Sequence, residues 1–228
     1  LGEFEKRVDT SEKRFFISER LTGVYIAKLM KDTTLKHKVV PISFVAEKVT
    51  IPIAMPWQEE KEFQIATTIT SVLANKNDTN FYQFYLLHNG DVSKKTKEKL
   101  EFFEKTYENC KIDFVNAGVN QEYYPLVLAE KLPKINKCIY MTEDVTVLRD
   151  LTEFYRTCST DDFYVVGAPL EKYDIYEEEK KVNTSFLVMN LMRLRQHKLC
   201  GRAIERMESG EDATSLFNEL CAGQLGYV

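Results

Sequence analysis

The sequence predicts an α/β fold in which helices flank a mostly parallel sheet. Between residues 49 and 115, three apolar β runs alternate with two helical patterns, and this alternation is typical of a parallel sheet. A fourth apolar run, at 138–141, predicts a strand that stops at the adjacent acids Glu143 and Asp144, and we call it the acid strand. Because ligands of open α/β sheets bind outside the carboxyl ends of the strands, these acids are the first candidates for chemistry.

The two helical patterns each carry one apolar face. The first begins near Lys61 and spaces its apolar residues as a helix requires: Phe63, Ile65, Ala66, Ile69, Val72 and Leu73. The second follows Ser93, whose hydroxyl is a favoured N-cap, and its apolar residues are Leu100, Phe103 and Tyr107. We therefore expect both helices to pack one side against the sheet.

The chain beyond the acid strand predicts further strands and helices. We expect a helical turn at 152–156, a strand at 163–166, an acid-rich loop at 171–181 and another strand at 186–190. Apolar residues from Leu191 to Met207 indicate one long helix that ends near Gly210. Asp212 is a favoured N-cap for a last helix that runs to about Cys221.

Residues 1–48 have the pattern of a separate N-terminal segment. A charged stretch leads into a helical pattern, and a strand-like run follows at 39–45, where Pro41 indicates a strand start or an edge. We expect this helix-strand appendage to precede a main domain at 49–228.

Composition excludes several classes of function. The net charge of −4 over 228 residues gives no reason to expect a nucleic-acid partner. The five cysteines lie far apart and most of them sit in apolar patterns, which indicates buried thiols in a reducing compartment. No apolar run reaches the ~20 residues of a membrane span, so we expect a cytoplasmic protein without a transmembrane segment.

The acid strand resembles a motif of glycosyltransferase family 8, Tyr-Leu-Asp-x-Asp-x-x-Val-x-x-Asp-Leu, whose Asp-x-Asp holds a divalent metal on a diphosphate. The matching residues here are Tyr140, Asp144, Val147, Asp150 and Leu151. The first Asp of the metal pair is replaced by Thr142.

Other pieces of the chain resemble the same family in the same order. They are residues 53–72, 84–90, Tyr123-Tyr124-x-Leu126, Leu132-Pro133 and Asn183 with Val188-Met189-Asn190-Leu191. Together with the acid strand they cover roughly 180 residues, about the length of one domain. The resemblance implies a GT-A type fold, in which a Rossmann-like nucleotide-binding half joins an acceptor half.

The resemblance also implies an activity: retaining transfer of a hexose from a nucleotide sugar, UDP-linked, to a glycan or lipid-linked acceptor in bacterial surface-polysaccharide synthesis. It implies Mn²⁺ or Mg²⁺ as cofactor with Asp144 as a ligand, and a nucleotide-sugar site that includes Gln58, Thr142, Glu143 and Asn183. A second reading of Asp144 stays open, in which it is a polar strand terminus that bonds a backbone amide.

Several family positions differ in this chain, and they motivate an alternative function. Gln58 stands where the family has Asp, and Glu60 and Lys61 replace Asn and Tyr. An Arg of the family's sugar-phosphate site is missing near Pro125, and Ala213-Thr214-Ser215 replaces Asp-Gln-Asp. The alternative is a catalytically inactive GT-A-like module that binds a partner or acceptor within a larger transferase.

Both ends of the chain suggest a longer polypeptide with other domains. The N-terminal segment resembles the end of another bacterial sugar-transferase-like domain, in which an Arg-aromatic-x-x-x-Glu-Arg-Leu helix precedes a Pro-Ile-Ser-Phe strand. The family's His-x-x-Gly-x-x-Lys-Pro-Trp segment, which closes over the diphosphate, would lie beyond Val228. We therefore expect the domain at 49–228 to be incomplete at its C-terminus.

Overall fold

The computed structural model describes residues 48–170 and 181–227. The N-terminal helix and strand predicted within residues 1–48, and nearly all of the acid-rich loop at 171–181, therefore lie outside the described residues. Within the described part of the chain, no helix is both long and apolar enough to cross a membrane.

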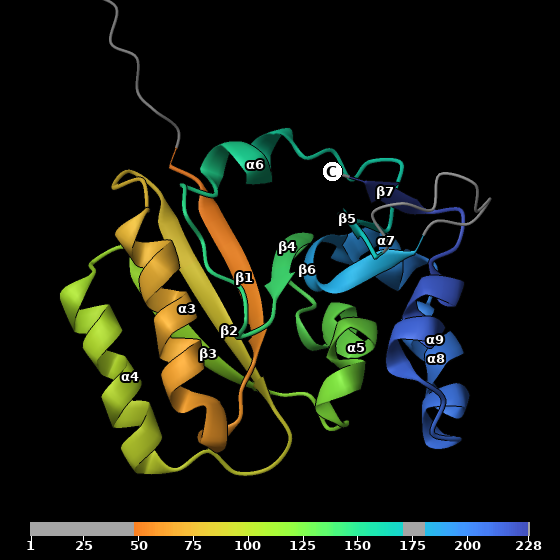
Figure 1. Cartoon of the computed structure of the whole chain (residues 1–228), viewed down its shortest axis with the longest axis horizontal. Coiled ribbons are helices and arrows are strands. Elements are labelled where there is room, and N and C mark those ends of the chain that lie inside the picture. Colours follow the sequence, from red (N-terminus) through yellow and green to blue (C-terminus); the bar gives the residue numbers. More distant parts are fainter. Residues whose placement is uncertain (1–47, 171–180, 228) are drawn as a thin grey trace, which may run out of the picture. The chain divides into compact units, whose positions relative to one another are not determined.

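The core of the domain is a mixed seven-stranded sheet with the strand order β3-β2-β1-β4-β6-β5-β7 (Figure 1). Its strands are β1 Thr50–Pro56, β2 Phe81–His88, β3 Cys110–Asn116, β4 Lys137–Met141, β5 Val165–Pro169, β6 Val182–Asn190 and β7 Leu225–Tyr227. Only β6 runs against its neighbours, because it pairs antiparallel with both β4 and β5. The predicted mostly parallel sheet is confirmed.

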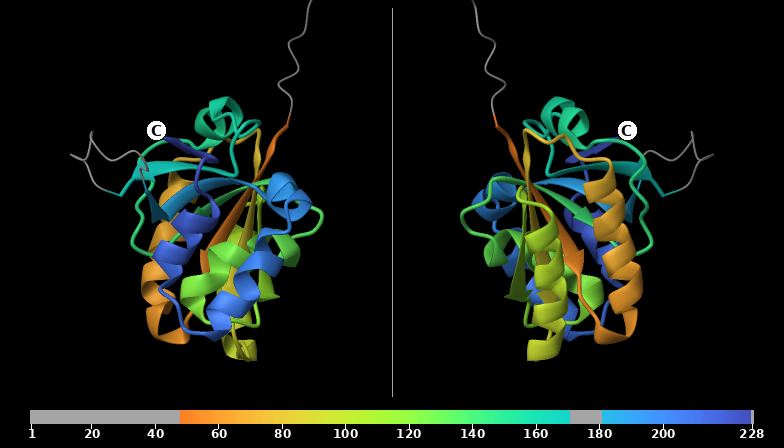
Figure 2. Two further views of the ribbon diagram at one scale, coloured as in Figure 1. Left: turned by 90° about the vertical axis from the view of Figure 1, so that its right-hand side faces the viewer. Right: turned by 90° about the vertical axis from the view of Figure 1, so that its left-hand side faces the viewer.

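Helices cover both faces of this sheet. They are α3 Glu62–Ala74, α4 Lys94–Thr106, α5 Tyr124–Lys131, α6 Thr152–Thr157, α7 Leu191–Gln196, α8 Leu199–Glu208 and α9 Ala213–Leu220, with short 3-10 turns η1 Glu59–Lys61 and η2 Gln121–Tyr123. Figure 2 shows the two groups from opposite sides, with α8 and α9 towards the viewer on the left and α3 and α4 on the right.

The side chains of β1 point alternately to the two faces of the sheet, so this strand packs against helices on both sides. Ile53 and Met55 pack with Ile69 of α3 on one face, whereas Ala54 packs with Leu128 of α5 on the other. Successive side chains of a strand point to opposite faces, so a central strand buried on both sides is apolar throughout. The continuous apolar run at the start of the domain thus follows from its place in the middle of the sheet.

The prediction of one long helix after β6 was wrong. The chain forms α7 and α8, and between them Lys198 takes a left-handed backbone conformation with φ 52°. Leu194 and Leu199 are both buried, yet a spacing of five residues would place them on different sides of one continuous helix. The break turns both towards the core. The predicted last helix is confirmed, because the Asp212 side chain accepts a hydrogen bond from the Ser215 amide at the start of α9.

Candidate functional site

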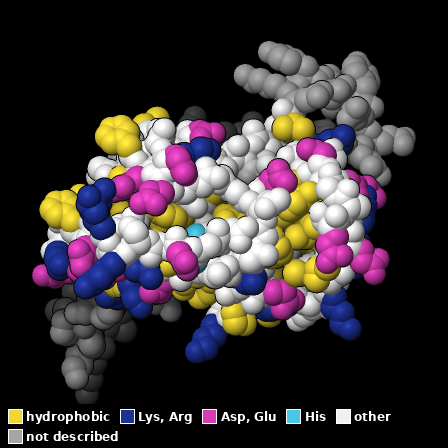
Figure 3. Space-filling view, turned by 90° about the horizontal axis from the view of Figure 1, so that it is seen from below, with side chains coloured by type: hydrophobic (Ala, Val, Ile, Leu, Met, Phe, Trp, Pro, Cys, Tyr) yellow, Lys and Arg dark blue, Asp and Glu magenta, His cyan; other side chains and the backbone are white. Residues whose placement is uncertain are grey.

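The candidate site lies where β1 and β4 end. The two strands pair in parallel, with Ala54 opposite Tyr140, so their carboxyl ends meet at one edge of the sheet. In the strand order β3-β2-β1-β4 the succession of strands reverses between β1 and β4, and ligands of open α/β folds bind at such a switch point. Figure 3 views this edge, and acidic and basic side chains lie mixed around it.

An ion pair joins the ends of the two strands. Lys61, just after β1, donates from Nζ to Oε1 of Glu143, just after β4. The Glu143 side chain is only 5% exposed, whereas that of Lys61 is 42% exposed. The hydrogen bond to Glu143 is the largest cause that raises the pKa of Lys61, and the charge of Asp144 adds to it. Lys61 is therefore a firmly charged ammonium that solvent and ligands can reach.

Two buried oxygen atoms at this edge have no hydrogen-bond partner among the described residues, Oε2 of Glu143 and Oγ1 of Thr142. Their backbones are well held: the Thr142 amide donates to the Ser185 carbonyl at 2.9 Å, and Thr68 Oγ1 donates to the Glu143 carbonyl at 2.9 Å. Buried polar atoms in folded proteins are nearly always paired with protein atoms or ordered water, so these two acceptors are free to bond water or a ligand.

The remaining predicted site residues lie at the same edge with weaker connections. Asp144 is exposed to solvent. Gln58 is half-buried, and its carbonyl accepts from the Lys61 amide at 3.1 Å. Asn183 is exposed near the start of β6, and its Oδ1 accepts from the Ser185 amide at 2.8 Å. Each residue is thus linked through the backbone to the cluster of Lys61, Thr142 and Glu143.

The loop that carries these acids is fastened to the body of the domain. Val147 donates from its amide to Ser71 Oγ at 3.0 Å, and its carbonyl accepts from Asn75 Nδ2 at 3.0 Å. At the end of the loop, the Asp150 carboxylate accepts hydrogen bonds from the Tyr82 hydroxyl and from the Asn77 amide. The family residues Val147 and Asp150 therefore hold the acid loop in place.

The described residues do not fit a Mn²⁺ or Mg²⁺ site. Such ions take about six oxygen ligands, several of them from carboxylates or bound water. In the described part of the chain, no three His, Cys, Asp or Glu side chains gather closely enough to hold a metal. Asp144 offers one exposed carboxylate and Thr142 a neutral hydroxyl, while an ammonium already occupies Glu143 Oε1. The assignment of Asp144 as a metal ligand stays a prediction.

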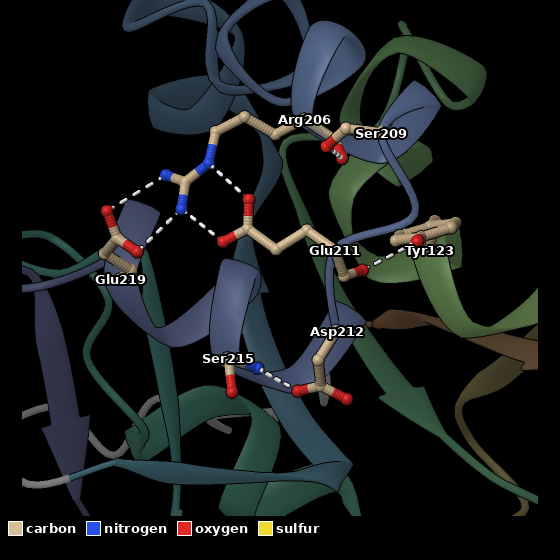
Figure 4. Close-up of polar contacts among 7 residues, drawn as sticks. All are labelled: Tyr123, Arg206, Ser209, Glu211, Asp212, Ser215 and Glu219. Carbon is tan, nitrogen blue, oxygen red and sulfur yellow. Dashed lines mark hydrogen bonds and ion pairs between the residues drawn. The ribbon is translucent and has the colours of Figure 1, made fainter.

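The segment that replaces the family's Asp-Gln-Asp element has a structural role (Figure 4). Asp212 caps α9 through Ser215, and the bond from the Ser215 amide is the largest cause that lowers the pKa of Asp212. Just before it, Glu211 accepts from Arg206 Nε at 2.7 Å, and its carbonyl accepts from the Tyr123 hydroxyl at 2.7 Å. The charged groups of this segment thus pair with each other or cap the helix.

Sequence reasoning missed Lys61 as a site residue. The family pattern has Tyr at this position, so the substitution counted only as a lost feature. The signal that could have found it is positional. A lysine shortly after the end of β1 lies beside whatever follows β4, because β1 and β4 are neighbours in the sheet.

Comparison with known proteins agrees with this architecture. The model of the family "Glycosyl transferase family 8" matches residues 52–225. The chain belongs to glycosyl transferase family 8. The comparison with curated protein sequences found no match.

Solved structures of low sequence identity share the fold. An active-site mutant of LgtC is 20% identical, with a TM-score of 0.64 over 78% of this chain and 72% of that chain. GlyE of Streptococcus pneumoniae TIGR4 is 15% identical, with a TM-score of 0.65 over 79% of this chain and 45% of GlyE. The bifunctional WbbM in its apo form is 16% identical, with a TM-score of 0.66 over 100% of this chain and 50% of WbbM. The chain thus spans about half the length of GlyE and WbbM, and its GT-A fold is confirmed.

Proposed function

We propose that this chain binds a UDP-linked sugar at the carboxyl edge of β1 and β4 and transfers its hexose, with retention, to a glycan or lipid-linked acceptor. Its membership of family 8 supports glycosyl transfer. The setting we propose is bacterial surface-polysaccharide synthesis in the cytoplasm, by a longer polypeptide of which residues 49–228 form one domain.

The observation that carries the proposal is the pair of unpaired buried oxygens at this edge, Thr142 Oγ1 and Glu143 Oε2. A buried acceptor without a partner costs ~1–3 kcal/mol. Ribose and hexose hydroxyl groups are donors that would remove this cost on binding. The Gln58 amide offers one donor and one acceptor to the edge of a pyrimidine base, and Asn183 lies across the same edge for the sugar.

The inactive module remains the second candidate, and one observation favours it. The residues in place of the family's acidic element, Ala213-Thr214-Ser215, begin helix α9 and carry no carboxylate, and the neighbouring Asp212 is engaged as a cap. An acceptor or nucleotide could then bind without transfer.

Melting curves with and without UDP test binding, and release of UDP from UDP-hexoses with candidate acceptors tests transfer. A ligand at ~100 times its dissociation constant stabilises a protein by ~2.7 kcal/mol. We expect a rise in melting temperature that Gln58→Ala weakens and that Gln64→Ala, an exposed glutamine on α3, leaves unchanged. No rise at millimolar UDP would contradict the proposal, and binding without UDP release would favour the inactive module.

A further inference from the structure

The acid end of β4 already has a cation of its own. The Lys61 ammonium bonds Glu143 Oε1 and lies close enough to Asp144 for that carboxylate to raise its pKa. A side chain thus stands among the acids where a metal ion would be needed to neutralise a diphosphate. A divalent ion in the same place would be repelled by the ammonium and would have to displace it from Glu143.

We infer that Lys61 takes the place of the divalent metal, so that nucleotide diphosphate binding at this edge depends on Lys61 and does not require a metal ion. This inference rests on the proposed function, because it concerns the same ligand at the same site. It departs from the metal cofactor that the family resemblance implies.

The geometry of the ion pair suits this role. Glu143 is buried and its backbone carbonyl is held by Thr68, so it is a fixed anchor for the ammonium. Lys61 has three N–H donors on a flexible stem, of which Glu143 Oε1 takes one. With 42% of its side chain exposed, the ammonium can bond phosphate oxygens while it keeps its anchor.

The acids around Lys61 make this lysine essential for binding a diphosphate at this edge. Glu59 and Glu60 are exposed on the turn before it, and Asp144 is exposed beside it. Glu62 is paired with Lys99 Nζ at 2.7 Å and is already neutralised. Within the segments 58–62 and 142–144, Lys61 is the only basic residue, and without it their acids would repel a diphosphate and attract a divalent cation instead.

The test is titration of the protein with UDP by calorimetry, in EDTA and separately in Mn²⁺. We expect the same dissociation constant in both buffers, and a value about tenfold or more higher for Lys61→Met, since a bond to a charged group is lost. Lys61→Arg should restore most of the affinity. The matched control is Lys105→Met, which removes a lysine from its pair with Glu101 on α4 and should bind UDP as the wild type does.

A second readout follows Mn²⁺ alone by its electron paramagnetic resonance signal. We expect no bound fraction at micromolar Mn²⁺ for the wild type and a bound fraction for Lys61→Met, in which Glu143 and Asp144 are both free. Lys61→Met leaves a buried charge unpaired, so Lys61→Met with Glu143→Gln serves as the variant that removes both charges and keeps the fold. It too should lose UDP affinity in EDTA.

The outcomes of the UDP titration separate the role of Lys61 from the proposed function. UDP binding that appears only with Mn²⁺ would overturn the role of Lys61 and leave the proposed function standing. Unchanged UDP affinity in Lys61→Met would also overturn it. Absence of UDP binding in both buffers would refute the proposed function and the inference with it.

Discussion

Replacement of Asp150 by alanine should loosen the loop that follows β4 and destabilise the domain. The Asp150 carboxylate accepts from the Tyr82 hydroxyl, from the Asn77 amide at 2.8 Å and from the Thr152 amide at 2.8 Å. At about 1 kcal/mol for each bond, the loss is about 3 kcal/mol. Because the Tyr82 side chain is fully buried, water cannot readily replace the lost acceptor.

Urea and thermal unfolding measure this loss. For a domain of this size about 3 kcal/mol corresponds to a fall of ~6–12 °C in melting temperature. The control is Asp78→Ala, which removes a carboxylate that is 89% exposed and should change the free energy of unfolding by less than about 0.5 kcal/mol. A loss below about 1 kcal/mol for Asp150→Ala would refute the reasoning that these bonds fasten the acid loop.

The effect should also depend on pH. Burial is the largest single influence and raises the pKa of Asp150, but the bonds from Thr152, Tyr82 and Asn77 together outweigh it and lower the pKa. A lowered folded pKa means that the stabilisation is complete above the ordinary value of about 3.9 and is lost as the pH falls through the folded value. The gap between wild type and Asp150→Ala should therefore stay constant at neutral pH and shrink in strong acid.

Two further predictions concern packing and thiol chemistry. Gly226→Ala should destabilise the protein by about 1–3 kcal/mol in urea unfolding, because its new Cβ would lie 2.8 Å from Val166 Cγ2. Its control is Gly201→Ala, inside α8 with open space around it, which should stabilise the protein by about 0.5–1 kcal/mol. Equal effects of the two substitutions would contradict the packing argument. Native protein should react with a thiol reagent first at the partly exposed Cys200, whereas Cys138 stays unmodified because burial raises its pKa. Early labelling of Cys138 would contradict the burial of this thiol in β4.

Much of the fold could be predicted from local patterns. The alternation of apolar β runs and amphipathic helices gave the parallel half of the sheet, since each pattern is set by residues close in sequence. The break at Lys198 was missed because Leu191 suits one helix face with Leu194 and another with Leu199, and only the fold shows that Leu194 and Leu199 are both buried. Its cause is tertiary: both halves must turn a leucine towards the same core.

The site could be predicted only in part. The acids at the end of β4 were found because a strand that stops at charged residues is a local signal. The pairing of Lys61 with Glu143 was missed because it joins residues 82 positions apart, through strands whose adjacency the sequence does not state. Likewise, the unpaired atoms of Thr142 and Glu143 depend on what packs around them.

The single tryptophan of the chain offers the most direct test of the central claim, that a nucleotide sugar binds where β1 and β4 end. Trp57 directly precedes Gln58, is 6% exposed and packs edge-on against Phe114 with ring centroids 5.6 Å apart. Its indole N–H gives one resolved nuclear magnetic resonance signal, which can be followed during titration with UDP in EDTA. If UDP binds at this edge, the signal shifts saturably, and a signal that stays fixed in the folded protein at millimolar UDP would contradict the claim.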